Sequence, residues 1–93
     1  MKDKVIETTG KIWHELGFRG QVDSRKLAQV LDEDEEIINL ALGWLVREDK
    51  IVCSERRNRI MFSLVESEMN IFKGFYGDQH SNKKESVWRR LLR

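Results

Sequence analysis

The sequence has no long hydrophobic run, and no stretch approaches the roughly 18 apolar residues of a membrane-spanning helix. Its first ten residues, MKDKVIETTG, are charged and lack the apolar segment of a secretory signal peptide. A single cysteine, Cys53, leaves no partner for an intramolecular disulfide. We therefore expect a cytoplasmic protein in a reducing compartment, with no membrane span.

Motifs of catalysis and of metal binding are also missing. The sequence has no glycine-rich phosphate loop, no nucleophile elbow and no metal-ligand spacing. The acidic run Asp32–Glu36 lacks the alternating ligands and the glycine of a calcium loop. His14 falls on the polar side of a predicted helix, His80 falls in a polar tail, and Cys53 is expected to be buried in a strand. We therefore expect a protein that is not an enzyme and that uses no metal, cofactor or small-molecule ligand.

What remains is the composition of one small globular domain. The 93 residues are 40% hydrophobic and 35% charged, which is typical of a folded chain with a single modest core. The net charge of +1 hides an asymmetry: residues 1–50 carry 8 basic and 11 acidic side chains, whereas residues 51–93 carry 9 and 5. A phosphate-bearing partner is therefore expected to meet the second half of the chain.

Three segments show the periodicity of helices, and two show that of strands. Helices are predicted over 3–16, 24–31 and 34–48. Expected helix ends are a C-terminal cap at Gly17, an N-terminal cap at Ser24, and a cap at Asp32 or Asp34 for the third helix. Residues 21–22 form a possible short strand, and residues 51–55 are predicted to pair antiparallel with 60–64, with Ile60, Phe62 and Leu64 facing inward.

The segment after Val65 has a different character. It contains an aromatic patch, NIFKGFY, then the polar stretch GDQHSNKKES and a terminal VWRRLLR. We expect a folded domain over 1–65 and a partly flexible C-terminal extension over 66–93. The end of the tail is either a basic amphipathic anchor or a segment that stays disordered until it binds; its relevant residues are Lys83, Lys84, Trp88, Arg89, Arg90, Leu91 and Arg93.

The order of helix, short strand, two helices and hairpin is that of a winged helix-turn-helix. The segment LAQVLDEDEEIINLALGWLVREDKIVC resembles a family of small bacterial winged helix-turn-helix domains that has no assigned function. The strongest local signature is ALGWLVREDKI, and the resemblance covers residues 3–65. It implies an α+β fold of three helices and a β-hairpin wing. It does not imply an activity, because one fold supports many functions.

The third predicted helix has two apolar groups, where one core-facing arc would suffice. The arc expected to face the core consists of Ile38, Ala41, Leu42 and Leu45. A polar strip follows, formed by Glu36, Asn39, Gly43 and Arg47, and beyond it lies a second apolar group of Ile37, Leu40 and Trp44. We expect this second group to pack against the chain's own NIFKGFY segment or a second copy of the domain. The alternative is that Trp44 is simply left partly exposed.

Basic side chains cluster at the tip of the predicted hairpin. Arg56, Arg57 and Arg59 surround Asn58, and a wing of this kind can contact a phosphate backbone or enter a minor groove. The alternative interpretation is a solvated turn that protects a sheet edge from aggregation. Further candidates for nucleic-acid contact are Arg25, Lys26 and Arg47.

The third helix itself is a poor match to a base-reading helix. A recognition helix should present basic and amide side chains to the major groove, but this one begins with five acids, Asp32–Glu36, which repel phosphate. The sequence therefore predicts a non-catalytic interaction domain that forms a homodimer through Ile37, Leu40 and Trp44 and contacts the DNA backbone through its arginine wing. The alternative is a conventional winged-helix transcription regulator that binds DNA.

Overall fold

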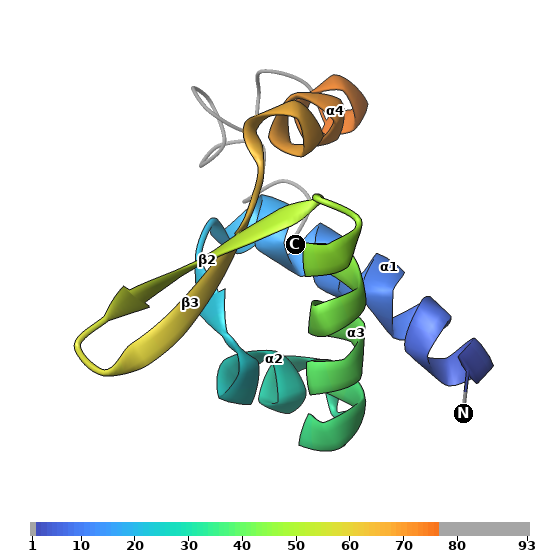
Figure 1. Ribbon diagram of the computed structural model, residues 1–93. Helices are drawn as coiled ribbons and strands as arrows, with labels where there is room; N and C mark the ends of the chain where they lie inside the picture. The colour runs from blue at the N-terminus through green and yellow to red at the C-terminus, as the bar shows by residue number, and fades with distance from the viewer. Residues whose placement is uncertain (1, 77–93) are drawn as a thin grey trace, which may run out of the picture.

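The computed structural model describes residues 2–76, which form four helices and one three-stranded antiparallel sheet (Figure 1). In chain order the elements are α1 (Lys2–Arg19), β1 (Val22–Asp23), α2 (Ser24–Leu31), α3 (Glu35–Arg47), β2 (Ile51–Arg56), β3 (Arg59–Leu64) and α4 (Glu66–Tyr76). The three predicted helices and the antiparallel hairpin are confirmed. The fold is a winged helix with an additional helix after the hairpin.

The core lies where α1, α2 and α3 meet the base of the sheet, and the β2–β3 hairpin projects to one side (Figure 1). The predicted inward arc of α3 is confirmed, because its four residues are 0–3% exposed. Burial of these apolar side chains supplies the main driving force for folding. The buried cluster consists of Ile12, Leu16, Val22, Leu27, Ile38, Ala41, Leu42, Leu45, Ile51, Leu64 and Phe72.

The sheet has the order β1-β3-β2, so the hairpin's second strand lies in the middle. The register runs from Ile51 opposite Leu64 at the base to Arg56 opposite Arg59 at the tip. Because the base lies on the core and the tip extends beyond it, burial falls along the strands: Leu64 is buried, but Ile60 is 57% exposed. The expectations that Ile60 faces inward and that Cys53 is buried are therefore wrong; both side chains are exposed.

Several predicted helix ends lie elsewhere. Helix α1 continues through Gly17 to Arg19, and Gly20, with φ of 91°, adopts the left-handed conformation that follows a helix. The N-terminal cap of α2 is Asp23, not Ser24: the carboxylate Oδ1 of Asp23 accepts a hydrogen bond from the backbone N–H of Lys26 at 2.7 Å. Asp34 occupies the cap position of α3 without a side-chain hydrogen bond.

Helix α4 was not predicted, and it contributes directly to the core. Its Phe72 is fully buried, with ring centroids 4.9 Å from Phe18 and 5.5 Å from Trp13 of α1. A Cβ atom at Gly17 would overlap the ring of Phe72, so the absence of a side chain at Gly17 lets α4 approach α1 closely. The aromatic residues of NIFKGFY thus pack against α1.

Polar contacts fix the position of α4. The indole Nε1 of Trp13 donates a hydrogen bond to Oε1 of Glu68 at 2.8 Å, and the Lys50 ammonium lies 3.6 Å from Oε2 of the same carboxylate. Glu68 therefore joins α4 both to α1 and to the turn before β2.

Among the described residues, no helix is long and apolar enough to cross a membrane. The predicted basic anchor near the C-terminus lies outside the described residues.

A second ion pair ties the beginning of α1 to the α2–α3 connection. The Lys4 ammonium lies 3.0 Å from Oε1 of Glu33. This hydrogen bond and the charge of Glu33 raise the pKa of Lys4, and the same hydrogen bond lowers the pKa of Glu33 below its ordinary value. The acidic run between α2 and α3 is thus partly neutralised from within the fold.

Candidate nucleic-acid interface

The first part of the candidate site is the beginning of α2. Because Asp23 caps this helix, the next three residues have helical geometry from the first turn, and Arg25 and Lys26 are exposed on it. Ser24 donates a long hydrogen bond, 3.5 Å, to Oε2 of Glu35 at the beginning of α3. The backbone that carries Arg25 and Lys26 is therefore held at a fixed position relative to β1 and α3.

The second part is the tip of the wing. Arg57 and Asn58 form a two-residue turn with φ of 51° and 67°, both in the left-handed region. Two-residue turns of this kind match the natural twist of a hairpin, and asparagine tolerates them well. The turn places Arg56 and Arg59 opposite each other on neighbouring strands and leaves Arg57 at the very end of the wing.

Asp23 of β1 and Gln21, which directly precedes this strand, supply partners for two of the three wing arginines. Asp23 Oδ2 lies 3.4 Å from Nη1 of Arg59, and Gln21 Oε1 accepts a hydrogen bond from Nη1 of Arg56 at 3.0 Å. Gln21 Nε2 also donates to the hydroxyl of Ser54 at 3.4 Å. All these side chains lie on the face of the sheet opposite the core, since Asp23 pairs in register with Met61 and Ser54 does likewise. Arg56 and Arg59 are thereby oriented before any ligand arrives.

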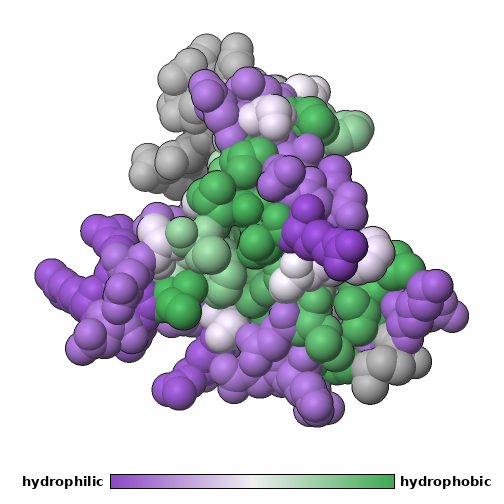
Figure 2. Space-filling view, in the orientation of Figure 1, coloured by the Kyte–Doolittle hydropathy of each residue, from purple (hydrophilic) through white to green (hydrophobic). Residues whose placement is uncertain are grey.

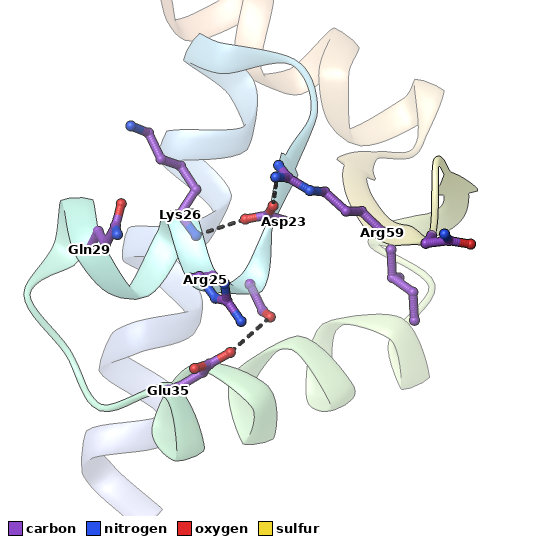
Figure 3. A pocket seen from close by; sticks show the side chains of 9 residues that line it. Asp23, Arg25, Lys26, Gln29, Glu35 and Arg59 are labelled. Carbon is purple, nitrogen blue, oxygen red and sulfur yellow. Dashed lines mark hydrogen bonds and ion pairs between the residues drawn. The ribbon is translucent and has the colours of Figure 1, made fainter.

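An open cleft of about 530 Å³ lies between the beginning of α2, the beginning of α3 and the wing. Its lining contains three cationic side chains, Arg25, Lys26 and Arg59, and two carboxylates, Asp23 and Glu35. Figure 3 shows Arg59 reaching from the wing toward Asp23, with Arg25 and Lys26 on the adjoining turn of α2. Cations from two elements more than thirty residues apart therefore border one cleft, where an anionic ligand can meet both.

The predicted nucleic-acid candidates divide into three groups. Arg25, Lys26 and Arg59 line the cleft, whereas Arg56 and Arg57 lie beside it along the wing. Arg47 stands apart in the last turn of α3, outside the cleft lining. Sequence reasoning missed the role of Asp23, whose position next to Arg59 depends on the pairing of β1 with β3. The signal that it overlooked was an acid directly before the second helix, a common capping position.

The outward side of α3 combines charged and apolar residues. Leu40 and Trp44 are 49% and 50% exposed, and the aromatic side chains of α4 pack on α1 instead of covering them. Ile37, predicted to share this apolar group, is only 8% exposed, because it packs within the single chain. Figure 2 shows hydrophobic residues over α3 on this side of the molecule, next to a hydrophilic wing. Within residues 2–76, no cluster of three potential metal ligands is present.

Comparison with known proteins places this geometry in a family. Residues 1–64 match the family described as "Winged helix-turn-helix domain (DUF2582)". The chain is similar to Uncharacterized protein MJ1608 of Methanocaldococcus jannaschii, with 40% identity over 53 residues that span 55% of this chain and 76% of that protein.

Solved structures show the same fold. Protein BT2368 from Bacteroides thetaiotaomicron has 31% identity and a TM-score of 0.61, over 68% of this chain and 77% of that one. The apo form of a Lactococcus lactis ZitR mutant has 22% identity and a TM-score of 0.69, over 97% and 68%. The Adhesin competence repressor (AdcR) of Streptococcus pyogenes has 22% identity and a TM-score of 0.66, over 91% of this chain but only 62% of the repressor's length. On the match over residues 1–64 and the fold that contains it, the chain belongs to the winged helix-turn-helix family DUF2582.

Proposed function

We propose that this domain is a non-catalytic module that binds the phosphate backbone of duplex DNA and associates with a second copy through Leu40 and Trp44. The observation that carries the DNA part is the gathering of Arg25, Lys26 and Arg59 around one open cleft, with Arg56 and Arg57 beside it. Support also comes from the fold, because AdcR is described as a repressor and a similar Pseudomonas aeruginosa protein as a probable transcriptional regulator.

Phosphate contact explains the wing better than base reading does. Neutralised phosphates release counterions and supply most of the sequence-independent affinity for DNA. Arginine side chains at an exposed hairpin tip can reach the backbone without insertion of a helix. In contrast, Glu35 and Glu36 are exposed in the first turn of α3, and a major groove would place them among phosphates. We therefore expect α2 and the wing, and not α3, to make the main contacts.

The second part of the proposal is self-association. Full burial of a large apolar side chain is worth roughly 1.5–3 kcal/mol, so covering the exposed halves of Leu40 and Trp44 on two copies contributes about 3–6 kcal/mol. Association itself costs at least about 4 kcal/mol in lost translational and rotational freedom. The difference of at most about 2 kcal/mol corresponds to a dissociation constant of tens of millimolar, so a dimer that forms at micromolar concentration requires further contacts on the same face of α3. Sedimentation equilibrium of the wild type and of Trp44→Ala measures it directly.

A titration of fluorescent DNA duplexes at about 50 and 200 mM salt tests the DNA part. For the wild type, log affinity should fall with log salt by about 0.9 per contacted phosphate. Replacing Arg56, Arg57 and Arg59 with alanine should flatten this slope by up to about three units and weaken binding to all sequences alike. Lys73→Ala, an exposed cation on α4, is the matched control and should leave the slope unchanged.

The competing function is sequence-specific regulation through α3. Asn39 and Arg47 are the exposed α3 side chains suited to base contact. Under our proposal, Asn39→Ala and Arg47→Ala leave sequence preference unchanged. Loss of preference for one sequence in either variant, with normal binding by the triple arginine variant, would establish α3 as the reading helix and refute backbone binding by the wing.

A further inference from the structure

The exposed stripe of α3 has a charge at each end and apolar residues between. Glu36, Leu40, Gly43, Trp44 and Arg47 follow the spacing of one helix face and are all exposed. The acid lies in the first turn and the base in the last turn, and Leu40 and Trp44 lie on either side of the midpoint. At 1.5 Å per residue, the two charges are about 16 Å apart along the helix axis.

This order makes the stripe complementary to itself only when it is reversed. A two-fold axis across the middle of the stripe brings Glu36 opposite the partner's Arg47 and Leu40 opposite the partner's Trp44. Parallel pairing would instead place like charges against each other at both ends. We propose that two copies of this chain associate through antiparallel α3 helices, with the apolar pair in the centre and an ion pair at each end. The inference specifies the geometry of the self-association proposed above and therefore rests on it.

Gly43 provides room at the centre of this contact. A Cβ atom at Gly43 would meet nothing within 4 Å in the single chain, so the backbone there is open to an incoming side chain. In the antiparallel arrangement the helices cross beside this residue, so the absence of a side chain at Gly43 leaves room for the partner helix. Small residues at a helix crossing allow closer approach of the backbones and greater burial of the large neighbours.

A second copy fits this surface better than the other available occupants. The aromatic residues of α4 already pack on α1, with Phe75 6.4 Å from Trp13 between ring centroids, so they are not free to cover Trp44. Duplex DNA is disfavoured because Glu36 belongs to the stripe. The cationic cleft lies at the opposite end of α3 from Arg47, and its lining does not include Glu36.

Charge exchange tests the antiparallel arrangement. The dimer dissociation constant of the full 93-residue chain is measured by sedimentation equilibrium for Glu36→Arg, Arg47→Glu and the double variant. Each single change should weaken the dimer by roughly tenfold, because it replaces two exposed attractions with two repulsions. The double variant should recover most of the affinity, since the exchanged charges again face each other. Lys73→Glu on α4 is the control for a charge reversal away from the stripe and should leave the constant unchanged.

The possible results separate the geometry from the proposed association. Equal weakening in the double variant and the singles overturns the antiparallel pairing, as does a wild-type dimer that neither single variant affects. A wild type that stays monomeric at high micromolar concentration overturns the self-association and this geometry together. Glu36→Gln, which removes the charge without reversal, should give a smaller loss, and thermal unfolding of each variant verifies that the domain remains folded.

Discussion

The two ends of the β2–β3 hairpin behave in opposite ways. At its base, Ile51 and Leu64 are buried and join a core that also takes in Phe72 from α4. At its tip, the side chains of Arg56 to Ile60 are exposed, and polar contacts to Gln21 and Asp23 replace apolar packing. Apolar burial contributes most of the stability of a fold, whereas exposed ion pairs contribute little. The base of the hairpin therefore determines whether the domain folds, and the tip is free to be specialised for a ligand.

The largest loss of stability should come from a substitution in the core at the base of the hairpin. Phe72→Ala removes a fully buried ring from between α1 and α4 and should lower the free energy of unfolding by roughly 3–5 kcal/mol. Urea unfolding followed by circular dichroism measures this loss. Phe75→Ala, which truncates a ring that is 75% exposed on the same helix, is the control and should cost far less. Similar losses in both variants would contradict the role assigned to Phe72.

Gly17→Ala should also lower the free energy of unfolding, but by a smaller amount than Phe72→Ala. Alanine is favoured over glycine in a helix by roughly 1 kcal/mol. However, the new methyl group would overlap the buried ring of Phe72, and overpacking typically costs about 1–3 kcal/mol. We therefore expect Gly17→Ala to unfold at a lower urea concentration than the wild type. Gly10→Ala on the same helix is the matched control and should be stabilising, because a Cβ atom there meets nothing within 4 Å.

At the tip, Asp23→Asn should change binding without changing the fold. Asparagine caps helices as well as aspartate does, so α2 keeps its hydrogen bond to Lys26. The change removes a negative charge 3.4 Å from the mostly exposed guanidinium of Arg59. An exposed pair of this kind is worth at most about 1 kcal/mol, so duplex affinity should rise by up to about fivefold.

The controls for Asp23→Asn separate local from overall charge. Asp49→Asn makes the same charge change at the other end of β2 and should raise affinity less. In an Arg59→Ala background, Asp23→Asn should lose most of its effect. Weaker binding by Asp23→Asn, with unchanged thermal unfolding, would show instead that the carboxylate is needed to position Arg59.

The smallest effect concerns the Lys4–Glu33 ion pair and depends on pH. Because the pKa of Glu33 in the folded protein lies below its ordinary value of 4.5, the pair stabilises the fold above that pH and the contribution is lost as the pH falls through the lowered pKa. Glu33→Gln should therefore be less stable than the wild type near pH 7, and the difference should shrink near pH 3. Urea unfolding at both pH values measures it, and a difference independent of pH would contradict the ionic contribution.

The sequence by itself determined helices α1, α2 and α3 and the β2–β3 hairpin. The apolar period of 34–48 predicted the inward arc of α3, and the alternation in 51–55 and 60–64 predicted the hairpin, because these patterns reflect the local geometry of helices and strands. The resemblance of residues 3–65 to a winged-helix family was confirmed by the family match. The concentration of arginine at the wing was also evident without a structure, whereas its role in binding remains a proposal.

Only the tertiary structure decided which of these residues meet. Periodicity placed Ile37 next to Trp44. Packing at the beginning of α3 buries Ile37, whereas Trp44 remains half-exposed. Asp23 and Arg59 are 36 residues apart and become neighbours through the pairing of β1 with β3. The aromatic segment after Val65 includes Phe72, whose ring packs against Gly17 of α1. Local patterns specify a side chain's direction on its own element, but burial and charge pairing depend on surfaces that distant parts of the chain provide.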